Sequence, residues 1–265
     1  TPVMLMVRIR SCHVTGQFQT RDNKRPPLSV RDALSNPRRD VSRIVLPPMS
    51  YLQEQDKINN RWPAAQAYIR EHGLNEVFGP QQAPVGIICQ GGMYNGVIRA
   101  LQRLGLAGIH GHTEVPIYCL NVTYPIVHDE FSDFIAGKEA VLVVEEGQPE
   151  FIEQQLGSLM FRAGTTTRLH GKDVFPMAGE YTGQVMLDGI EGFLRKAAPH
   201  YLPAQVRAPN APAAAIPDLS NTVPIRPPGF CTGCPERPIF AAMKLVQEEL
   251  GEHQISADIG CHLIA

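Results

Sequence analysis

The hydrophobic pattern between residues 84 and 196 alternates between two forms. Short, continuous apolar runs that end in turn residues are followed by longer segments in which apolar residues recur at helical spacing. The first form is typical of strands buried on both faces, and the second of amphipathic helices. We therefore predict strands over 84–92, 115–121, 139–147 and 165–171, and helices over 93–105, 128–136, 150–162 and 180–197.

This strand–helix order predicts a parallel sheet with helices on both faces, because parallel strands need crossover connections. We assign it to one three-layer α/β domain over 73–196. Upstream, residues 1–48 open with an apolar run over 3–9, which predicts a buried strand at the end of a preceding α/β domain. Residues 49–72 carry a helical pattern and are expected to form a connecting helix, with Ser50 as its cap and with Pro63 kinking or dividing it.

The segment 197–228 holds eight prolines and eight alanines, a composition that predicts an extended linker rather than a core. Residues 229–265 then begin a second α/β domain. Its helix is expected over 238–250, with Pro238 in the first turn and Gly251 as the stop, and its strand over 253–260. Since the sequence starts at Thr1 and stops inside this domain, we expect a piece of a longer protein.

Three cysteines near the C-terminal end form the strongest candidate for a chemical site. Cys231 and Cys234 enclose Thr-Gly, and Gly233 permits the tight turn that brings two sulfurs together. Cys261 follows 27 residues later, at the end of the next predicted strand. Convergent thiolates hold zinc or an iron–sulfur cluster, but a redox dithiol and an inert pair remain open. A fourth ligand could be His253, His262 or a further cysteine.

Four weaker candidates each have a structural alternative. The glycine-rich turn over 89–96 could cradle a phosphate or only allow close packing. Glu145 and Glu146, at the end of a predicted strand, could serve a site, contact a partner domain, or have an exposed or ion-paired structural role. The remaining candidates are an anion-binding set of Arg8, Arg10 and His13, and a metal dyad or solvated turn of His110 and His112.

Composition excludes several classes of partner. The chain is 43% hydrophobic and 19% charged, and its formal net charge of -2 leaves no basic excess to attract nucleic acid or an anionic membrane. No apolar run is long enough for a membrane span, and the first residues do not resemble a signal peptide. Cys12, Cys89 and Cys119 lie in or beside apolar runs, as core residues do, so we expect a cytoplasmic protein without a disulfide framework.

The C-terminal motifs resemble a known family. The segment from Arg226 to Leu245, followed by the run from Ala257 to His262, is similar to the start of the thiamine-diphosphate-binding domain of the indolepyruvate ferredoxin oxidoreductase alpha subunit. Residues 2–16 resemble the end of the family's pyrimidine-binding domain. Residues 85–106 and 140–156 resemble its transketolase-C-terminal-like domain.

The resemblance implies oxidative decarboxylation of an aryl-pyruvate to acyl-CoA, with ferredoxin as electron acceptor. It implies thiamine diphosphate, Mg²⁺ held by ligands outside this chain, and a 4Fe-4S cluster on Cys231, Cys234 and Cys261. Asp258, Gly260 and His262 would border the thiamine diphosphate together with Cys261. The implied partners are ferredoxin, coenzyme A, and a second subunit (beta or gamma type) or fused domain.

Some positions depart from the family pattern. Glu236 stands where the family has His, and His262 where it has Tyr. The family's magnesium-binding Gly-Asp-Gly…Asn motif, its catalytic glutamate and its ferredoxin-like cysteine clusters are not present in these residues, so we expect the chain alone to be inactive. Two alternatives stay open: a non-catalytic module with a structural zinc, and a thiamine-dependent decarboxylase or synthase without a redox role.

Overall fold

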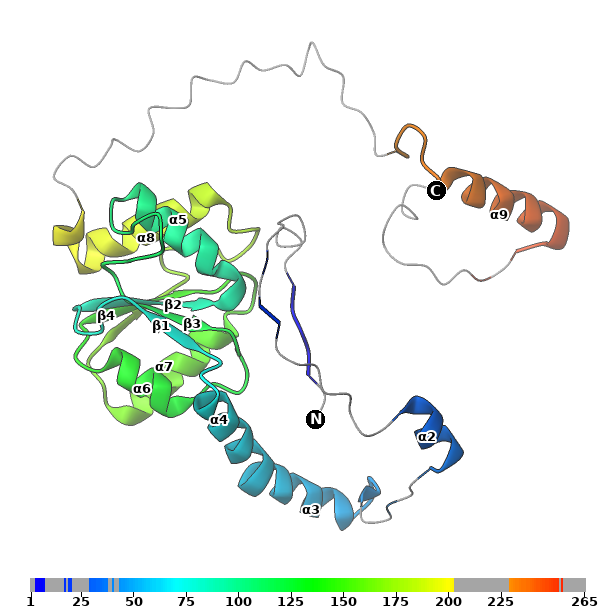
Figure 1. Cartoon of the computed structure of the whole chain (residues 1–265), viewed down its shortest axis with the longest axis horizontal. Helices are drawn as coiled ribbons and strands as arrows, with labels where there is room; N and C mark the ends of the chain where they lie inside the picture. Colours follow the sequence, from blue (N-terminus) through cyan, green and yellow to red (C-terminus); the bar gives the residue numbers. More distant parts are fainter. Residues whose placement is uncertain are drawn as a thin grey trace. The chain divides into compact units, whose positions relative to one another are not determined.

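The computed structural model describes residues 3–7, 17, 19–20, 29–37, 40, 43–202, 229–252 and 254 (Figure 1). The chain divides into two compact units, Thr1–Val206 and Arg207–Ala265. Each is described by itself.

The first unit is built on a five-stranded sheet with the order β1-β3-β2-β4-β5. Strands β3, β2, β4 and β5 run parallel to their neighbours, as the hydrophobic pattern predicts, whereas β1 pairs antiparallel with β3. The wholly parallel prediction is therefore wrong, because β1 is too short and too exposed at the sheet edge to leave an apolar run in the sequence. The strands are β1 (Glu76–Phe78), β2 (Val85–Gln90), β3 (Ile117–Leu120), β4 (Ala140–Val144) and β5 (Arg168–His170).

Helices cover both faces of the sheet and confirm the three-layer α/β arrangement (Figure 1). A 3-10 turn, η3 (Gly91–Met93), leads into α5 (Tyr94–Arg103), which packs on one face beside α8 (Gly183–Ala197). The other face is covered by α6 (His128–Ile135) and α7 (Phe151–Ala163). Alternate residues of β2 and β4 enter the two cores, which is why these strands read as continuous apolar runs.

The segment before the sheet is a long helix interrupted by a π-helical turn. It consists of α3 (Met49–Asp56), η2 (Lys57–Arg61) and α4 (Trp62–Glu71). Pro63 lies in the first turn of α4, directly after the π-helical turn. Because proline cannot donate the expected backbone hydrogen bond, the widened turn accommodates it, and the predicted irregularity at Pro63 is confirmed.

The predicted cap at Ser50 is wrong. The helix begins at Met49 with Pro48 at its N-cap, so Ser50 lies inside the first turn, and no side chain caps this end. The other end is fastened to the α/β body, where the Gln66 amide donates to the carbonyl of Ile126 at 2.6 Å and Arg70 pairs with Asp129 at 2.6 Å.

The described residues before Met49 differ from the prediction. Residues 3–7 are exposed and lie in no strand, so the buried strand expected over 3–9 is wrong for them. A strand requires a hydrogen-bonded neighbour, and none of the described strands pairs with this run. A short helix, α2 (Val30–Ser35), was not predicted because no hydrophobic period marks it; the Ser29 side chain caps it by accepting from Asp32 N.

After α8 the first unit continues through a 3-10 turn, η4 (Pro199–Tyr201), and the rest of the predicted linker, 203–228, lies outside the described residues. In the second unit, α9 (Arg237–Leu250) confirms the predicted helix. Pro238 is in its first turn and Gly251, with φ of 88°, ends it. The strand expected over 253–260 falls almost wholly outside the described residues.

Two glycines in α8 offer a matched test of this packing. A Cβ on Gly189 would lie 2.2 Å from Cε1 of Phe175, a buried ring that is itself stacked on Tyr181, so the ring cannot move aside freely. We expect Gly189→Ala to lower the free energy of unfolding by about 1–3 kcal/mol.

The control is Gly192→Ala, because a Cβ there would meet Val174 at an ordinary 4.0 Å. This change should be neutral or raise stability by about 0.5–1 kcal/mol, since alanine restricts the unfolded chain. Urea unfolding followed by circular dichroism measures both. Equal effects of the two substitutions would contradict the close approach of α8 to Phe175.

Candidate functional site at the carboxyl edge of the sheet

The order of the strands places a topological switch point between β2 and β4. These neighbours are parallel, yet the helices that follow them, α5 and α7, cover opposite faces of the sheet. In open α/β sheets, ligands bind in the crevice that such a divergence leaves outside the carboxyl ends of the strands. The residues that end β2 and β4 therefore determine whether this domain has a ligand site.

Glu145, directly after β4, is a buried carboxylate with 6% of its surface exposed. Its oxygens accept hydrogen bonds from the backbone N–H of Ile152 at 3.0 Å and of Glu153 at 3.1 Å. Glu150, the residue at the N-cap of α7, makes no capping bond with its own side chain. Glu145 thus supplies the negative charge and the acceptors that the helix N-terminus requires, and occupies the place where a phosphate would bind.

Glu146 connects the carboxyl ends of β4 and β2, across the expected crevice. Its backbone N–H donates to Oε1 of Gln90, the last residue of β2, at 3.1 Å. Its carboxylate accepts from the backbone N–H of Tyr181, the residue before the cap of α8, at 2.6 Å. Both predicted carboxylates are therefore used within the fold, which favours their structural interpretation.

Lys172 completes this network from the loop after β5. Its ammonium donates to the carbonyls of Glu145 at 2.7 Å and Gly147 at 2.9 Å, and to the Tyr181 hydroxyl at 2.7 Å. These three bonds use all three ammonium protons. Burial lowers the pKa of Lys172, although the nearby carboxylates oppose that effect. Burial and the charges of Glu146, Glu145 and Glu153 raise the pKa of Tyr181 to about 12, so its hydroxyl stays protonated and donates to the Pro176 carbonyl at 3.0 Å.

The backbone of the same loop is held by Glu153 of α7. Its carboxylate accepts from the N–H of Lys172 at 2.9 Å, and burial raises its pKa. A Cβ on Gly171 would lie 2.1 Å from that carboxylate, so a larger residue here would require the Glu153 side chain to move. The hydrophobic pattern did not identify Lys172 or Tyr181; the available signal was a lysine directly after the strand predicted over 165–171.

The glycine-rich turn after β2 is explained by close packing. Oδ1 of Asn121 lies 2.6 Å from the position of a Cβ on Gly91, and the methyl group of Met186 lies 3.2 Å from one on Gly96. The Asn121 amide donates to the Leu74 carbonyl and to Glu76, both at 2.9 Å. A side chain of the domain thus fills the space at Gly91 that a phosphate cradle would leave open.

The Cys-x-x-Cys segment forms the predicted turn. Cys234 N–H donates to the Cys231 carbonyl at 3.1 Å, and Gly233 adopts a φ of 73°. The turn precedes α9, and the ring of Phe230 stacks on Phe240 in that helix, with centroids 5.4 Å apart. Both thiols are free; Cys231 is exposed and Cys234 is half-buried.

The other proposed members of this site lie outside the described residues, namely Asp258, Gly260, Cys261, His262 and the alternative ligand His253. Among the residues that the structure does describe, no group of three or more His, Cys, Asp or Glu side chains could hold a metal ion. Of the proposed metal ligands, the described residues therefore include two thiols, both from one turn.

The remaining candidates contribute no assembled site. His110 and His112 are exposed, in a turn closed by the Gly108 N–H to the His112 carbonyl at 2.7 Å. Arg8, Arg10, Cys12 and His13 fall outside the described residues. Cys89 and Cys119 are buried core residues, as expected. Across the described parts of the chain, the structure holds no helix long and apolar enough to cross a membrane.

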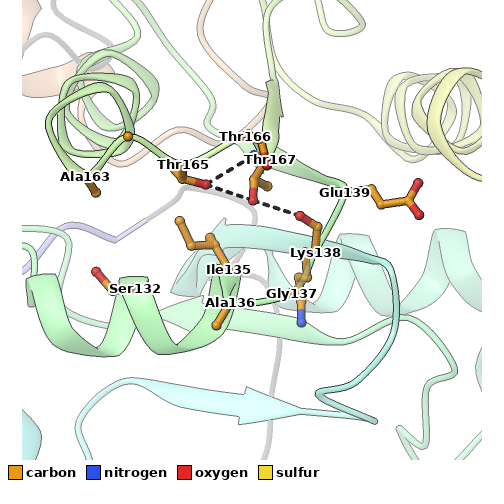
Figure 2. Close-up of a pocket in the computed structure, with 11 residues that line it drawn as sticks. Ser132, Ile135, Ala136, Gly137, Lys138, Glu139, Ala163, Thr165, Thr166 and Thr167 are labelled. Carbon is orange, nitrogen blue, oxygen red and sulfur yellow. Dashed lines mark hydrogen bonds between the residues drawn. The ribbon is translucent and has the colours of Figure 1, made fainter.

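A pocket of about 530 Å³ lies at the opposite, amino edge of the sheet (Figure 2). The C-terminal ends of α6 and α7 line it together with the threonines that precede β5. The hydroxyls face one another: Thr165 donates to Thr167 at 3.1 Å, and Thr167 donates to the Lys138 carbonyl at 2.8 Å. The hydroxyls of Thr165 and Thr167 therefore serve contacts within the domain.

Three comparisons with known proteins bear on this fold. The family described as indolepyruvate oxidoreductase domain matches residues 75–191. Over 99% of its length the chain is 28% identical to indolepyruvate oxidoreductase subunit IorA of Methanothermobacter thermautotrophicus, of which it covers 39%. The chain is a homologue of this alpha subunit. It is also 30% identical, over 72% of its length, to the subunit of the same name from Pyrococcus horikoshii, of which it covers 27%.

The chain thus spans well under half of the length of these curated relatives. Among solved structures, a 2-oxoglutarate:ferredoxin oxidoreductase from Magnetococcus marinus is 21% identical, with a TM-score of 0.37 over 56% of this chain and 24% of that one. A split-gene transketolase is 17% identical, with a TM-score of 0.35 over 46% of this chain and 41% of that one. Similarities this weak do not bear on function.

The first prediction from this site concerns Glu145. We expect Glu145→Ala to lower the free energy of unfolding by about 1–3 kcal/mol, because it leaves the buried N–H groups at the start of α7 without acceptors. Glu145→Gln keeps one acceptor oxygen and should cost less. Urea unfolding measures both, with the exposed Glu139→Ala as control. Unfolding of Glu145→Ala at the control's urea concentration would show that α7 does not depend on this carboxylate.

The second concerns Asp173, which accepts from His170 Nδ1 at 2.9 Å, from Gly171 N–H at 2.9 Å and from the Lys196 ammonium at 3.0 Å. Burial alone would raise the pKa of Asp173, but these bonds outweigh it and lower the pKa from 3.8 to about 2. A depressed pKa in the folded state means that the carboxylate stabilises the fold above about pH 4. This contribution is lost as the pH falls toward 2.

Asp173→Asn should therefore lower the melting temperature at neutral pH, and its difference from the parent chain should shrink between pH 4 and pH 2. The effect will be modest, since this side chain is 44% exposed and solvent screens it. Thermal unfolding at several pH values provides the measurement, with Asp133→Asn as an exposed control. A difference that stays constant down to pH 2 would rule out the linkage.

Proposed function

We propose that this chain is part of a thiamine-diphosphate-dependent 2-oxoacid:ferredoxin oxidoreductase of the indolepyruvate type. The whole enzyme would decarboxylate an aryl-pyruvate oxidatively and form acyl-CoA, with ferredoxin as the electron acceptor. Within it, the α/β domain over 73–196 serves as a scaffold that positions neighbouring domains. The reaction class is supported by relatives named indolepyruvate oxidoreductase subunit IorA that align with 99% of this chain.

The closed carboxyl edge is the observation that supports the scaffold role. The switch point is where such a sheet would bind a cofactor, yet Glu145 occupies the helix N-terminus, and Gln90 and Glu146 bridge the two strands. Lys172 has all three ammonium protons engaged. A general acid or base must have a proton position available to the substrate, and these bonds leave this lysine none. The domain is thus suited to holding its shape rather than to reacting.

The chemistry would then lie in the second unit and in parts of the enzyme beyond these residues. Cys231 and Cys234 suit a cluster, because a two-residue spacing with a flexible glycine offers two thiols from one turn. We propose that they hold a 4Fe-4S cluster together with Cys261 and one further ligand. When bound, such a cluster would supply one-electron transfer.

Asp258, Gly260, Cys261 and His262 are proposed to border the thiamine diphosphate. The Mg²⁺ ligands are expected elsewhere in the enzyme, in a second subunit or a further domain. Glu236 and His262, which differ from the family pattern, would lie beside this site and influence the choice of 2-oxoacid. A reducing cytoplasm suits an enzyme that exposes a thiol such as Cys231.

A substitution in the intact enzyme tests the cluster assignment. In the full-length subunit with its partners, Cys231→Ser should remove about four irons and as many acid-labile sulfides per chain, and should abolish ferredoxin reduction. Thr232→Ser is the matched control, because it alters the same turn and keeps both thiols. Metal analysis, labile-sulfide assay and electron paramagnetic resonance of the reduced protein provide the measurements.

Three outcomes would overturn the proposal. If Cys231→Ser keeps its iron and its ferredoxin reduction, the turn is not a cluster site. If the parent enzyme instead holds one zinc and no labile sulfide at these cysteines, the second unit is a structural zinc module. If the parent enzyme decarboxylates the 2-oxoacid but holds no iron and reduces no ferredoxin, it is a non-redox thiamine enzyme.

A further inference from the structure

Two buried cysteines lie side by side on the neighbouring strands β2 and β3, near the carboxyl ends of both. Cys89 in β2 and Cys119 in β3 are direct register partners in the parallel ladder. Both thiols are free, and their side chains are only 1% and 3% exposed. They belong to the same core cluster, beneath α5 and α8, so both side chains lie on one face of the sheet.

The register brings the pair within reach of a disulfide bond. Adjacent strands lie about 4.7–4.9 Å apart, and disulfides form between Cα atoms about 4.4–6.8 Å apart. Directly paired Cβ atoms are a little farther apart than the roughly 3.8 Å that an unstrained disulfide prefers. A bond here therefore requires a small local adjustment, and strained disulfides are the more easily reduced ones.

The surroundings make the two sulfurs unequal. The Cys119 thiol donates to Oδ1 of Asn121 at 3.5 Å. Its interaction with Cys89 lowers the pKa of Cys119, although burial opposes the shift, whereas the same interaction and burial raise the pKa of Cys89. Cys119 is thus the thiol that ionises first. The half-buried ring of Tyr94 lies beside the pair. Burial, followed by the charges of these two thiols, raises the pKa of the Tyr94 hydroxyl.

We propose that Cys89 and Cys119 are a redox-responsive thiol pair that forms a reversible disulfide across β2 and β3. With a low-molecular-weight disulfide as oxidant, the Cys119 thiolate attacks one sulfur, forms a mixed disulfide and releases one thiolate. The Cys89 thiol then loses its proton, attacks the Cys119 sulfur and releases the second thiol. The pair gives up two electrons and two protons, and the oxidant becomes two thiols.

Burial sets the rate of this reaction. Both sulfurs must become accessible through local opening of the strand ends near Tyr94, so the pair should react much more slowly than the exposed Cys231. This order of reaction distinguishes the pair from an exposed redox dithiol. The inference is independent of the function proposed above, since it uses only residues of the α/β domain.

The test uses the 265-residue chain with Cys231→Ser and Cys234→Ser, so that the other close thiol pair is absent. The chain is incubated with oxidised glutathione, unfolded in the presence of N-ethylmaleimide, digested with trypsin and analysed by mass spectrometry. We expect a linked peptide pair that contains Cys89 and Cys119, formed in most molecules and lost after dithiothreitol treatment. Cys119→Ala in the same background should give no such pair.

Several results would overturn the inference: both cysteines remain fully alkylated after prolonged exposure, each carries glutathione without an internal link, or either is linked to Cys12 or Cys261. Circular dichroism establishes whether Cys119→Ala folds. If it does not, the linked peptide from the background chain decides the question, with a sample that omits glutathione as its control.

Discussion

The α/β domain depends on one buried carboxylate that replaces an external ligand. Glu145 follows β4 at the carboxyl edge of the sheet, where the positive end of α7 would otherwise attract an anion from outside. With its carboxylate bonded to the first N–H groups of α7, the helix is fixed to the strand that precedes it. Lys172 then donates to both the Glu145 carbonyl and the Tyr181 hydroxyl. Because Tyr181 lies in the loop that leads to α8, these two bonds connect that loop to the end of β4.

The two units differ in which polar groups are used within the fold. The switch point of the first unit is bridged by its own side chains, while the second unit presents two free thiols on a turn in front of α9. The same division explains the candidates that proved structural: Glu145, Glu146 and the glycines after β2 all serve contacts inside the domain.

Much of the fold was predictable because buried strands and helices require apolar residues at regular positions in the sequence. Strands β2, β3 and β4 are buried on both faces and appear as apolar runs, and α5 and α8 show the spacing of helices that pack by one side. The elements that were not predicted are those that bury little surface. Strand β1 has three residues at the sheet edge, and helix α2 has no buried residue. The run over 3–7 shows the opposite error, because an apolar pattern indicates a need for burial but cannot supply the neighbouring strand.

The sequence by itself determined the features that are settled over a few residues: the Cys231–Cys234 turn through Gly233, the end of α9 at Gly251, and the strand–helix order of the α/β domain. Only the tertiary structure decided that Glu145 is a cap, that Lys172 donates its three ammonium hydrogen bonds within the domain, and that Cys89 pairs with Cys119. These outcomes depend on strand order and register, which bring together residues far apart in the chain. A hydrophobic pattern gives the elements their type but leaves open which of them become neighbours.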